Sequence, residues 1–253
     1  MIQLSRPIMP GFLVKNQKDL TDKLMDAVTK YKGYENIPEK EKDILIKSYR
    51  HEEIKSTLFK SSNEKCAFCE SIPGDSGYLE VEHYHPKSLY PNETFKWKNL
   101  LPSCKKCNIP KSDLDTKKYP IVNPYDYNPD DYFKYSGLKI VVKEDAIDKE
   151  IANNTIEACN LNSPRLFKPR AALLIALSQY ENDLEKCIKD VHKSDTERKR
   201  KNKIVNLIDS IEIIEDNVTS EHNYSAFSKN FLDSSEIYQT AKKICKDFLN
   251  NED

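Results

Sequence analysis

The sequence has no apolar run that approaches the roughly 20 residues needed to cross a bilayer. Its opening stretch, MIQLSRPIMPGFLV, carries Pro7 and Pro10 where a signal peptide needs an uninterrupted apolar segment. These absences argue against a membrane-spanning protein and against a secreted one. We therefore expect a cytoplasmic protein with no membrane partner.

The sequence also lacks an excess of positive charge, because 40 Lys and Arg face 41 Asp and Glu for a formal net charge of -1. This balance excludes a protein that coats polyanions through its overall charge, so nucleic-acid binding has to come from a local patch. There is no internal repeat and no low-complexity segment. Hydrophobic residues still make up 38% of the 253 residues, which is enough for a folded chain.

Cysteine is present in an uneven pattern. Four of the seven cysteines form two C-x-x-C pairs separated by 34 residues, and the other three stand alone. The pairs predict one tetrahedral zinc site, and four thiolates would leave no open position, so the zinc would be structural. Four unrelated buried thiols, or a redox C-x-x-C, are the weaker alternatives, and we expect the single cysteines to pack in cores. The predicted zinc ligands are Cys66, Cys69, Cys104 and Cys107.

Hydrophobic periodicity predicts helices on both sides of a loop-rich middle. Apolar spacing favours helices over 17–31 and from Pro38 to about residue 59, and regular periodicity is lost from Cys66 to about Tyr135. The segment LKIVVK, from Leu138 to Lys143, has the β-branched residues of a strand. Beyond it, apolar stripes that begin near Leu173 and near Ile237 predict helices packed on one face.

Polar residues follow a fixed order between the cysteine pairs. The stretch VEHYHPKS holds Glu82, His83 and Pro86, and the chain then runs through Asn99 to the second pair in CKKCNIPK. Over the 46 residues from Cys66 to Lys111, this order resembles the HNH endonucleases of the four-cysteine zinc type. The resemblance implies a ββα-metal fold, in which a hairpin and a helix surround one catalytic divalent ion that helps to cut phosphodiester bonds.

The resemblance also implies a role for each matching residue. Glu82 and Asn108 would supply oxygen ligands to the catalytic ion, and such hard ligands favour Mg²⁺ or Mn²⁺. His83 would be the general base that takes a proton from the attacking water. Asn99 would be a structural residue that closes the hairpin loop. One departure is that Glu82 stands where the family usually has Asp.

His85 and a group of lysines each allow more than one interpretation. If the strand continued through the motif, His85 would share a face with His83, which would suit a phosphate contact or a third metal ligand; a surface or packing role is the alternative. From residue 87 to 118 there are eight lysines against three acidic residues, a patch that suits phosphate backbones but also zinc thiolates or solubility. The candidate nucleic-acid contacts are His85, Lys87, Lys105, Lys106 and Lys111.

The expected fold class is α+β, a mainly α-helical chain with a central zinc-stapled ββα-metal nuclease core. We divide the chain into an N-terminal helical segment (1–62), the HNH core (63–145) and a C-terminal helical region (146–253). A wider resemblance, from about Tyr34 to Arg170, is to the HNH nucleases of anti-phage operons such as Septu and certain retrons. It implies a defence nuclease that acts on nucleic acid, DNA rather than RNA, with an ABC/AAA-like ATPase partner. A stand-alone restriction-type nuclease and a non-catalytic zinc module that binds nucleic acid are the alternatives.

Overall fold

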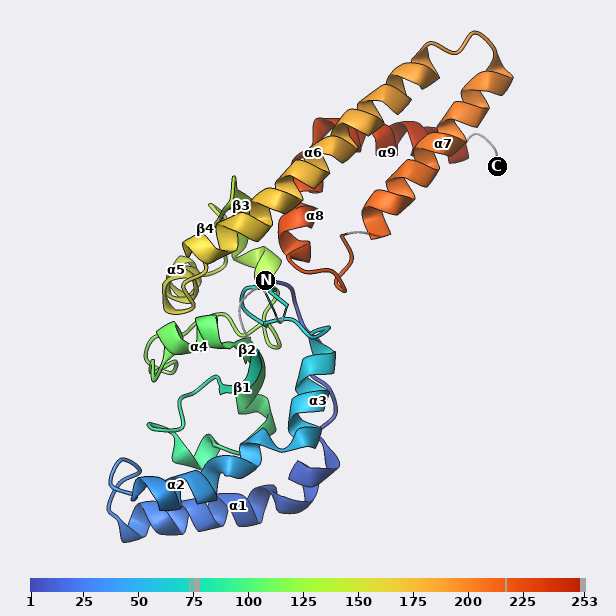
Figure 1. The fold of residues 1–253 in the computed structure, drawn as a ribbon. Helices are drawn as coiled ribbons and strands as arrows, with labels where there is room; N and C mark the ends of the chain where they lie inside the picture. Colours follow the sequence, from blue (N-terminus) through green and yellow to red (C-terminus); the bar gives the residue numbers. More distant parts are fainter. Residues whose placement is uncertain (73, 75–77, 217, 251–253) are drawn as a thin grey trace. The chain divides into compact units, whose positions relative to one another are not determined.

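A computed structural model describes residues 1–72, 74, 78–216 and 218–250 of the chain (Figure 1). Residues 73 and 75–77, which fall in the predicted nuclease core, lie outside the described residues. The chain forms two compact units, Met1–Ser163 and Pro164–Asp253, and each is described by itself. The α+β, mostly helical character is confirmed, whereas the predicted division into three parts stays a prediction.

The first unit begins with helices whose residues line one side of the cavity described below. Helix α1 (Gly11–Lys30) is followed by α2 (Glu39–Ile46), the 3-10 turn η1 (Lys47–Arg50) and α3 (Glu52–Ser61). The predicted single helix from Pro38 to about residue 59 is therefore wrong. Its break is at His51, which has an extended backbone and whose Nδ1 accepts a hydrogen bond from the Glu53 amide, so that it caps α3.

A two-stranded antiparallel sheet lies at the centre of this unit. Strand β1 (Leu79–His83) pairs with β2 (Leu100–Cys104), and α4 (Lys105–Lys111) follows β2 directly. Helix α3 packs against both strands, and α4 packs against both as well. The connection between the strands contains the 3-10 turns η2 (Pro91–Glu93) and η3 (Trp97–Asn99). The order along the chain is thus strand, strand, helix (Figure 1).

A second hairpin and a helix complete the first unit. Strand β3 (Phe133–Ser136), which follows the turn η4 (Pro129–Asp131), pairs with β4 (Lys139–Val142). The predicted strand at LKIVVK is therefore confirmed, and Gly137 supplies the left-handed turn at φ 54 that joins the two strands. Helix α5 (Lys149–Ala158) packs against β4, and the Asp148 carboxylate caps its first turn.

The second unit is a helical bundle formed by α6 (Pro164–His192), α7 (Glu197–Asp216), α8 (Ser225–Ser234) and α9 (Glu236–Leu249). The predicted stripes are confirmed: Leu177 and Leu184 of α6 share a buried core with Ala241 of α9. Cys245 belongs to this core and Cys187 packs against it, as expected of single cysteines. Across the described ranges of both units, no helix combines the length and apolar character that a bilayer crossing requires.

Candidate metal centre and active site

The four paired cysteines meet in one buried cluster. Their Sγ atoms all lie within 4.8 Å of one another, although the two pairs are far apart in the sequence. Cys66 and Cys69 lie in the turn after α3, while Cys104 ends β2 and Cys107 lies in the first turn of α4. The backbone N–H of Cys104 donates to Sγ of Cys66 at 3.3 Å, so the two pairs already contact each other. The predicted convergence of these residues is confirmed.

The cluster has the chemistry and spacing of a metal site. A tetrahedral zinc ion with Zn–S bonds of about 2.3 Å holds its sulfur atoms about 3.8 Å apart. The Sγ atoms of Cys69 and Cys104 are 3.7 Å apart, which fits this geometry. Burial raises the pKa of the Cys66 thiol, and a bound cation is what would favour its thiolate form. The cluster can therefore bind a metal ion such as zinc.

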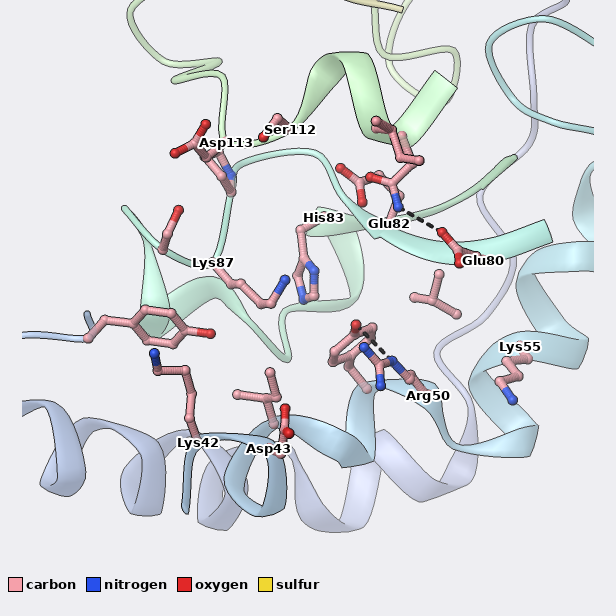
Figure 2. A pocket seen from close by; sticks show the side chains of 18 of the residues that line it. Lys42, Asp43, Arg50, Lys55, Glu80, Glu82, His83, Lys87, Ser112 and Asp113 are labelled. Carbon is pink, nitrogen blue, oxygen red and sulfur yellow. Dashed lines mark hydrogen bonds between the residues drawn. The ribbon is translucent and has the colours of Figure 1, made fainter. Parts of the chain in front are cut away.

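A cavity of about 1060 Å³ adjoins the β1–β2 hairpin. One side is formed by β1, the residues just after it and α4, and the other by α2, η1 and α3 (Figure 2). Predicted site residues and residues from the N-terminal helices therefore share one space. Its charged and polar lining includes Lys42, Asp43, Arg50, Lys55, Glu80, Glu82, His83, Lys87, Asn108 and Asp113.

His83 is held as a neutral imidazole in this cavity. It is buried, and its Nε2 lies 3.0 Å from the backbone oxygen of Thr94. A carbonyl oxygen can only accept, so Nε2 carries the proton and Nδ1 keeps its lone pair. Burial lowers the pKa of His83 to about 3, with a smaller effect from the positive charge of Lys87. The imidazole is therefore neutral at pH 7 and able to accept a proton at Nδ1.

Glu82 forms a buried ion pair with Lys111. The Nζ of Lys111 donates to Oε1 of Glu82 and to the backbone oxygen of His83, each at 2.7 Å. Burial raises the pKa of the Glu82 carboxyl, and the adjacent ammonium of Lys111 opposes that rise. Because the Lys111 side chain is 0% exposed, it cannot present its charge to a phosphate backbone in this conformation. The expected nucleic-acid contact at Lys111 is thus replaced by a structural ion pair.

We expect Lys111→Met to lower the free energy of unfolding by about 3–5 kcal/mol, because it leaves the Glu82 carboxylate buried without its partner. Lys105→Met is the matched control: Lys105 is exposed on the same helix, and its loss should cost no more than about 0.5 kcal/mol. Urea denaturation of the full chain measures both. Adding Glu82→Gln to the Lys111→Met variant should restore part of the stability. Equal stabilities of the two single variants would contradict the buried pair.

Asn108 is oriented by a carboxylate that the sequence analysis did not select. Its Nδ2 donates to Oε2 of Glu80 at 3.0 Å, which is the interaction drawn from Glu80 in Figure 2. Because a carboxylate accepts only, the amide nitrogen must face Glu80 and Oδ1 must point elsewhere. Among the described residues, no hydrogen bond to that Oδ1 is found. Glu82 and Asn108 thus line one cavity with oxygen atoms of the kind that Mg²⁺ or Mn²⁺ prefers.

Asn99 and His85 have contacts outside the cavity lining. Asn99 joins the ends of the loop between the strands: Oδ1 accepts from the His85 amide at 2.7 Å, and Nδ2 donates to the backbone oxygens of His85 and Glu93. Strand β1 ends at His83, so the condition that would have placed His85 on the His83 face is not met. The His85 Nδ1 instead lies 2.7 Å from Oγ1 of Thr116.

The other lysines predicted to contact nucleic acid lie in different places. Lys87 lines the cavity, whereas Lys105 and Lys106 are exposed on α4 and are not among the described residues of its lining. Glu80 and Arg50 also line the cavity, and neither was predicted from the sequence. The first had a usable signal, since Glu80 precedes Glu82 by two positions in a strand and shares its face. No signal in the sequence pointed to Arg50, because only tertiary packing brings η1 to β1.

Two known proteins are similar to this chain. Septu protein PtuB of Bacillus thuringiensis is 35% identical over 172 residues, which cover 67% of this chain and 58% of the relative. Septu protein PtuB of Bacillus mycoides is 26% identical over 208 residues, covering 68% of this chain and 66% of the relative. The chain thus spans less than two thirds of the length of either curated relative, and no protein-family model matches it. About two thirds of the chain is therefore similar in sequence to Septu protein PtuB.

Proposed function

We propose that the chain is a metal-dependent HNH endonuclease that hydrolyses phosphodiester bonds in nucleic acid, DNA rather than RNA. The observation that carries the proposal is a neutral histidine whose Nδ1 has no hydrogen bond with the described residues, in the cavity that Glu82 and Asn108 also line. The strand, strand, helix order of β1, β2 and α4 supports a ββα-metal core. In this proposal the cysteine cluster binds zinc, which fixes the hairpin to α4.

Each residue has one task in the proposed hydrolysis. Nδ1 of His83 takes a proton from a water molecule as the water oxygen attacks phosphorus and the bond to the leaving oxygen breaks. Thr94 holds the imidazole in the required tautomer through its backbone oxygen. Glu82 and Asn108 would hold Mg²⁺ or Mn²⁺, which when bound offsets the negative charge that develops on the phosphate. Glu80 accepts from the Asn108 amide nitrogen, so that the amide oxygen of Asn108 would be available to that ion.

We further propose that this nuclease is the effector of a bacterial anti-phage defence system and acts with an ABC/AAA-like ATPase. The similarity to two proteins named Septu protein PtuB supports the link to Septu systems. It also favours this assignment over a stand-alone restriction-type enzyme. A gene for an ATPase beside the gene for this chain would agree with the proposal, whereas a methyltransferase gene there would favour restriction.

The function is tested by incubating the purified chain, with and without its neighbouring ATPase, with supercoiled plasmid, single-stranded DNA and RNA. We expect nicking or cutting of DNA when Mg²⁺ or Mn²⁺ is added and none when both are left out, since the water and phosphate need the cation. Zinc content is measured in parallel, so that loss of the structural ion is not mistaken for loss of the catalytic one. Binding without cleavage under every condition would instead support a non-catalytic module.

A further inference from the structure

Three cations of the cavity lining, Arg50, Lys55 and Lys87, form no salt bridge with a described residue. Lys111, by contrast, is matched by Glu82. Lys87 is half-buried, and burial lowers its pKa, which reflects the cost of holding an ammonium there. Such a charge in a cavity is stabilised by an anion that enters from solution.

Tyr49 brings Arg50 and Lys87 next to His83. Its buried ring packs edge-on against the His83 ring, with 4.6 Å between the centroids. Cζ of Arg50 lies 4.9 Å from the centroid of the same Tyr49 ring, and Nζ of Lys87 lies 5.8 Å from it. Figure 2 shows Arg50 and Lys87 on either side of the His83 ring in this view. An anion held by these two cations would therefore be adjacent to the proposed base.

We propose that Arg50 and Lys87 form a phosphate-binding site beside His83 that holds the backbone of a polynucleotide. The proposal rests on the nuclease function given above and adds a residue from the N-terminal helices to the site. Phosphate oxygens suit both groups, because a guanidinium binds them through parallel N–H donors and an ammonium binds them as a point charge. Contacts to phosphate oxygens carry no information about the bases, so a site of this kind binds without sequence preference.

The hydrogen bond between Tyr49 and Arg50 sets the direction of the guanidinium. Nε of Arg50 donates to the Tyr49 hydroxyl at 2.9 Å. This bond uses the inner donor, and the terminal nitrogens make no hydrogen bond to a described residue, which leaves them for a ligand. Tyr49 is thus a positioning residue, and its hydroxyl should matter only while Arg50 is present.

The test measures binding of labelled DNA and RNA 20-mers by fluorescence anisotropy, without divalent cations and over a range of salt concentrations. We expect Arg50→Ala and Lys87→Ala each to weaken binding roughly 10-fold at low salt. Each should also reduce the slope of log K against log salt by about 0.7–0.9, since one phosphate contact is lost. Lys23→Ala is the control, because Lys23 is exposed on α1 and paired with Asp19 outside the cavity.

Tyr49→Phe separates positioning from general packing. It keeps the ring against His83 and removes the hydroxyl that accepts from Arg50. We expect it to weaken binding several-fold in the wild-type chain and to have no further effect in the Arg50→Ala chain. Equal effects in both backgrounds would overturn the positioning role. Thermal melting of each variant confirms that it is folded.

The outcomes for the site and for the nuclease are distinguishable. The phosphate site would be overturned, even if cleavage occurs, by either of two results. One is that Arg50→Ala and Lys87→Ala change neither the affinity nor the slope of log K against log salt. The other is that the wild-type chain does not bind the oligonucleotides. Inorganic phosphate that competes as well as unlabelled oligonucleotide would also overturn it, because that result describes a small-anion site. Arg50- and Lys87-dependent binding with no cleavage under any condition would keep the site and refute the nuclease.

Discussion

Loss of the metal from the cysteine cluster should unfold the Met1–Ser163 unit. Structural zinc contributes about 10–16 kcal/mol of apparent binding free energy, which is comparable to the whole stability of a typical domain, about 5–15 kcal/mol. We expect the unit to need the proposed zinc, because the sheets among its described residues have only two strands each and such hairpins are marginal alone. The cluster also joins the turn after α3 to the end of β2 and the first turn of α4.

The experiment uses a double variant that carries both Cys104→Ser and Cys107→Ser. The single variant Cys187→Ser is its control. Cys187 packs against the core of the second unit, far from the cluster in the sequence, so its loss should leave the zinc content unchanged. We expect about one zinc per wild-type chain by elemental analysis, and none in the double variant. Circular dichroism should show the loss of the first unit's melting transition. A zinc-free double variant that melts like the wild-type chain would contradict the structural role.

Replacement of His83 is expected to lower the cleavage rate by about 10²- to 10⁴-fold, the usual contribution of a general base. His83→Gln is preferred to His83→Ala, because the glutamine amide can still donate to the Thr94 carbonyl and fills most of the space. Substrate affinity should change little, since the imidazole is neutral and contributes no positive charge. Single-turnover cleavage and anisotropy measure the two effects separately.

The pKa of His83 adds a pH criterion to this prediction. A histidine with a pKa near 6.5 would lose its neutral form as the pH falls through 6.5, and the rate would fall with it. The pKa of His83 is lowered to about 3 by burial, so the neutral form persists as the pH falls from 8 to 5. The rate should therefore show no decline from this group over that range.

His85→Ala is the matched control for His83. Its ring contacts Thr116 and does not belong to the cavity lining formed by described residues, so we expect the variant to stay within a few-fold of the wild-type rate. A variant at position 85 that loses cleavage while His83→Gln retains it would reverse the assignment of the base. This comparison also decides the task of the second histidine in VEHYHPKS.

The cysteine cluster could be predicted because its spacing is encoded locally, whereas the order of the β1–β2 hairpin and α4 was only an implication of the family resemblance. Two C-x-x-C pairs in one chain are typical of metal binding, and the convergence of the four cysteines is confirmed. The strand at LKIVVK and the helical stripe that includes Leu177 and Leu184 followed from hydrophobic period alone. The continuous helix from Pro38 failed because the periodic signal does not show a single extended residue at His51.

The sequence by itself thus determined the cysteine cluster and the helical bundle, because spacing and period are properties of neighbouring residues, and the family resemblance indicated the residues to suspect around His83. Only the tertiary structure decided how those residues pair. Lys111 is drawn inward because Glu82 is buried opposite it, and a buried carboxylate needs a partner. Arg50 ends η1, and Leu79, which begins β1, follows it by 29 positions. Arg50 reaches the cavity because packing brings these two elements to the same space. Contacts of this range depend on the fold as a whole and leave no periodic signal in the chain.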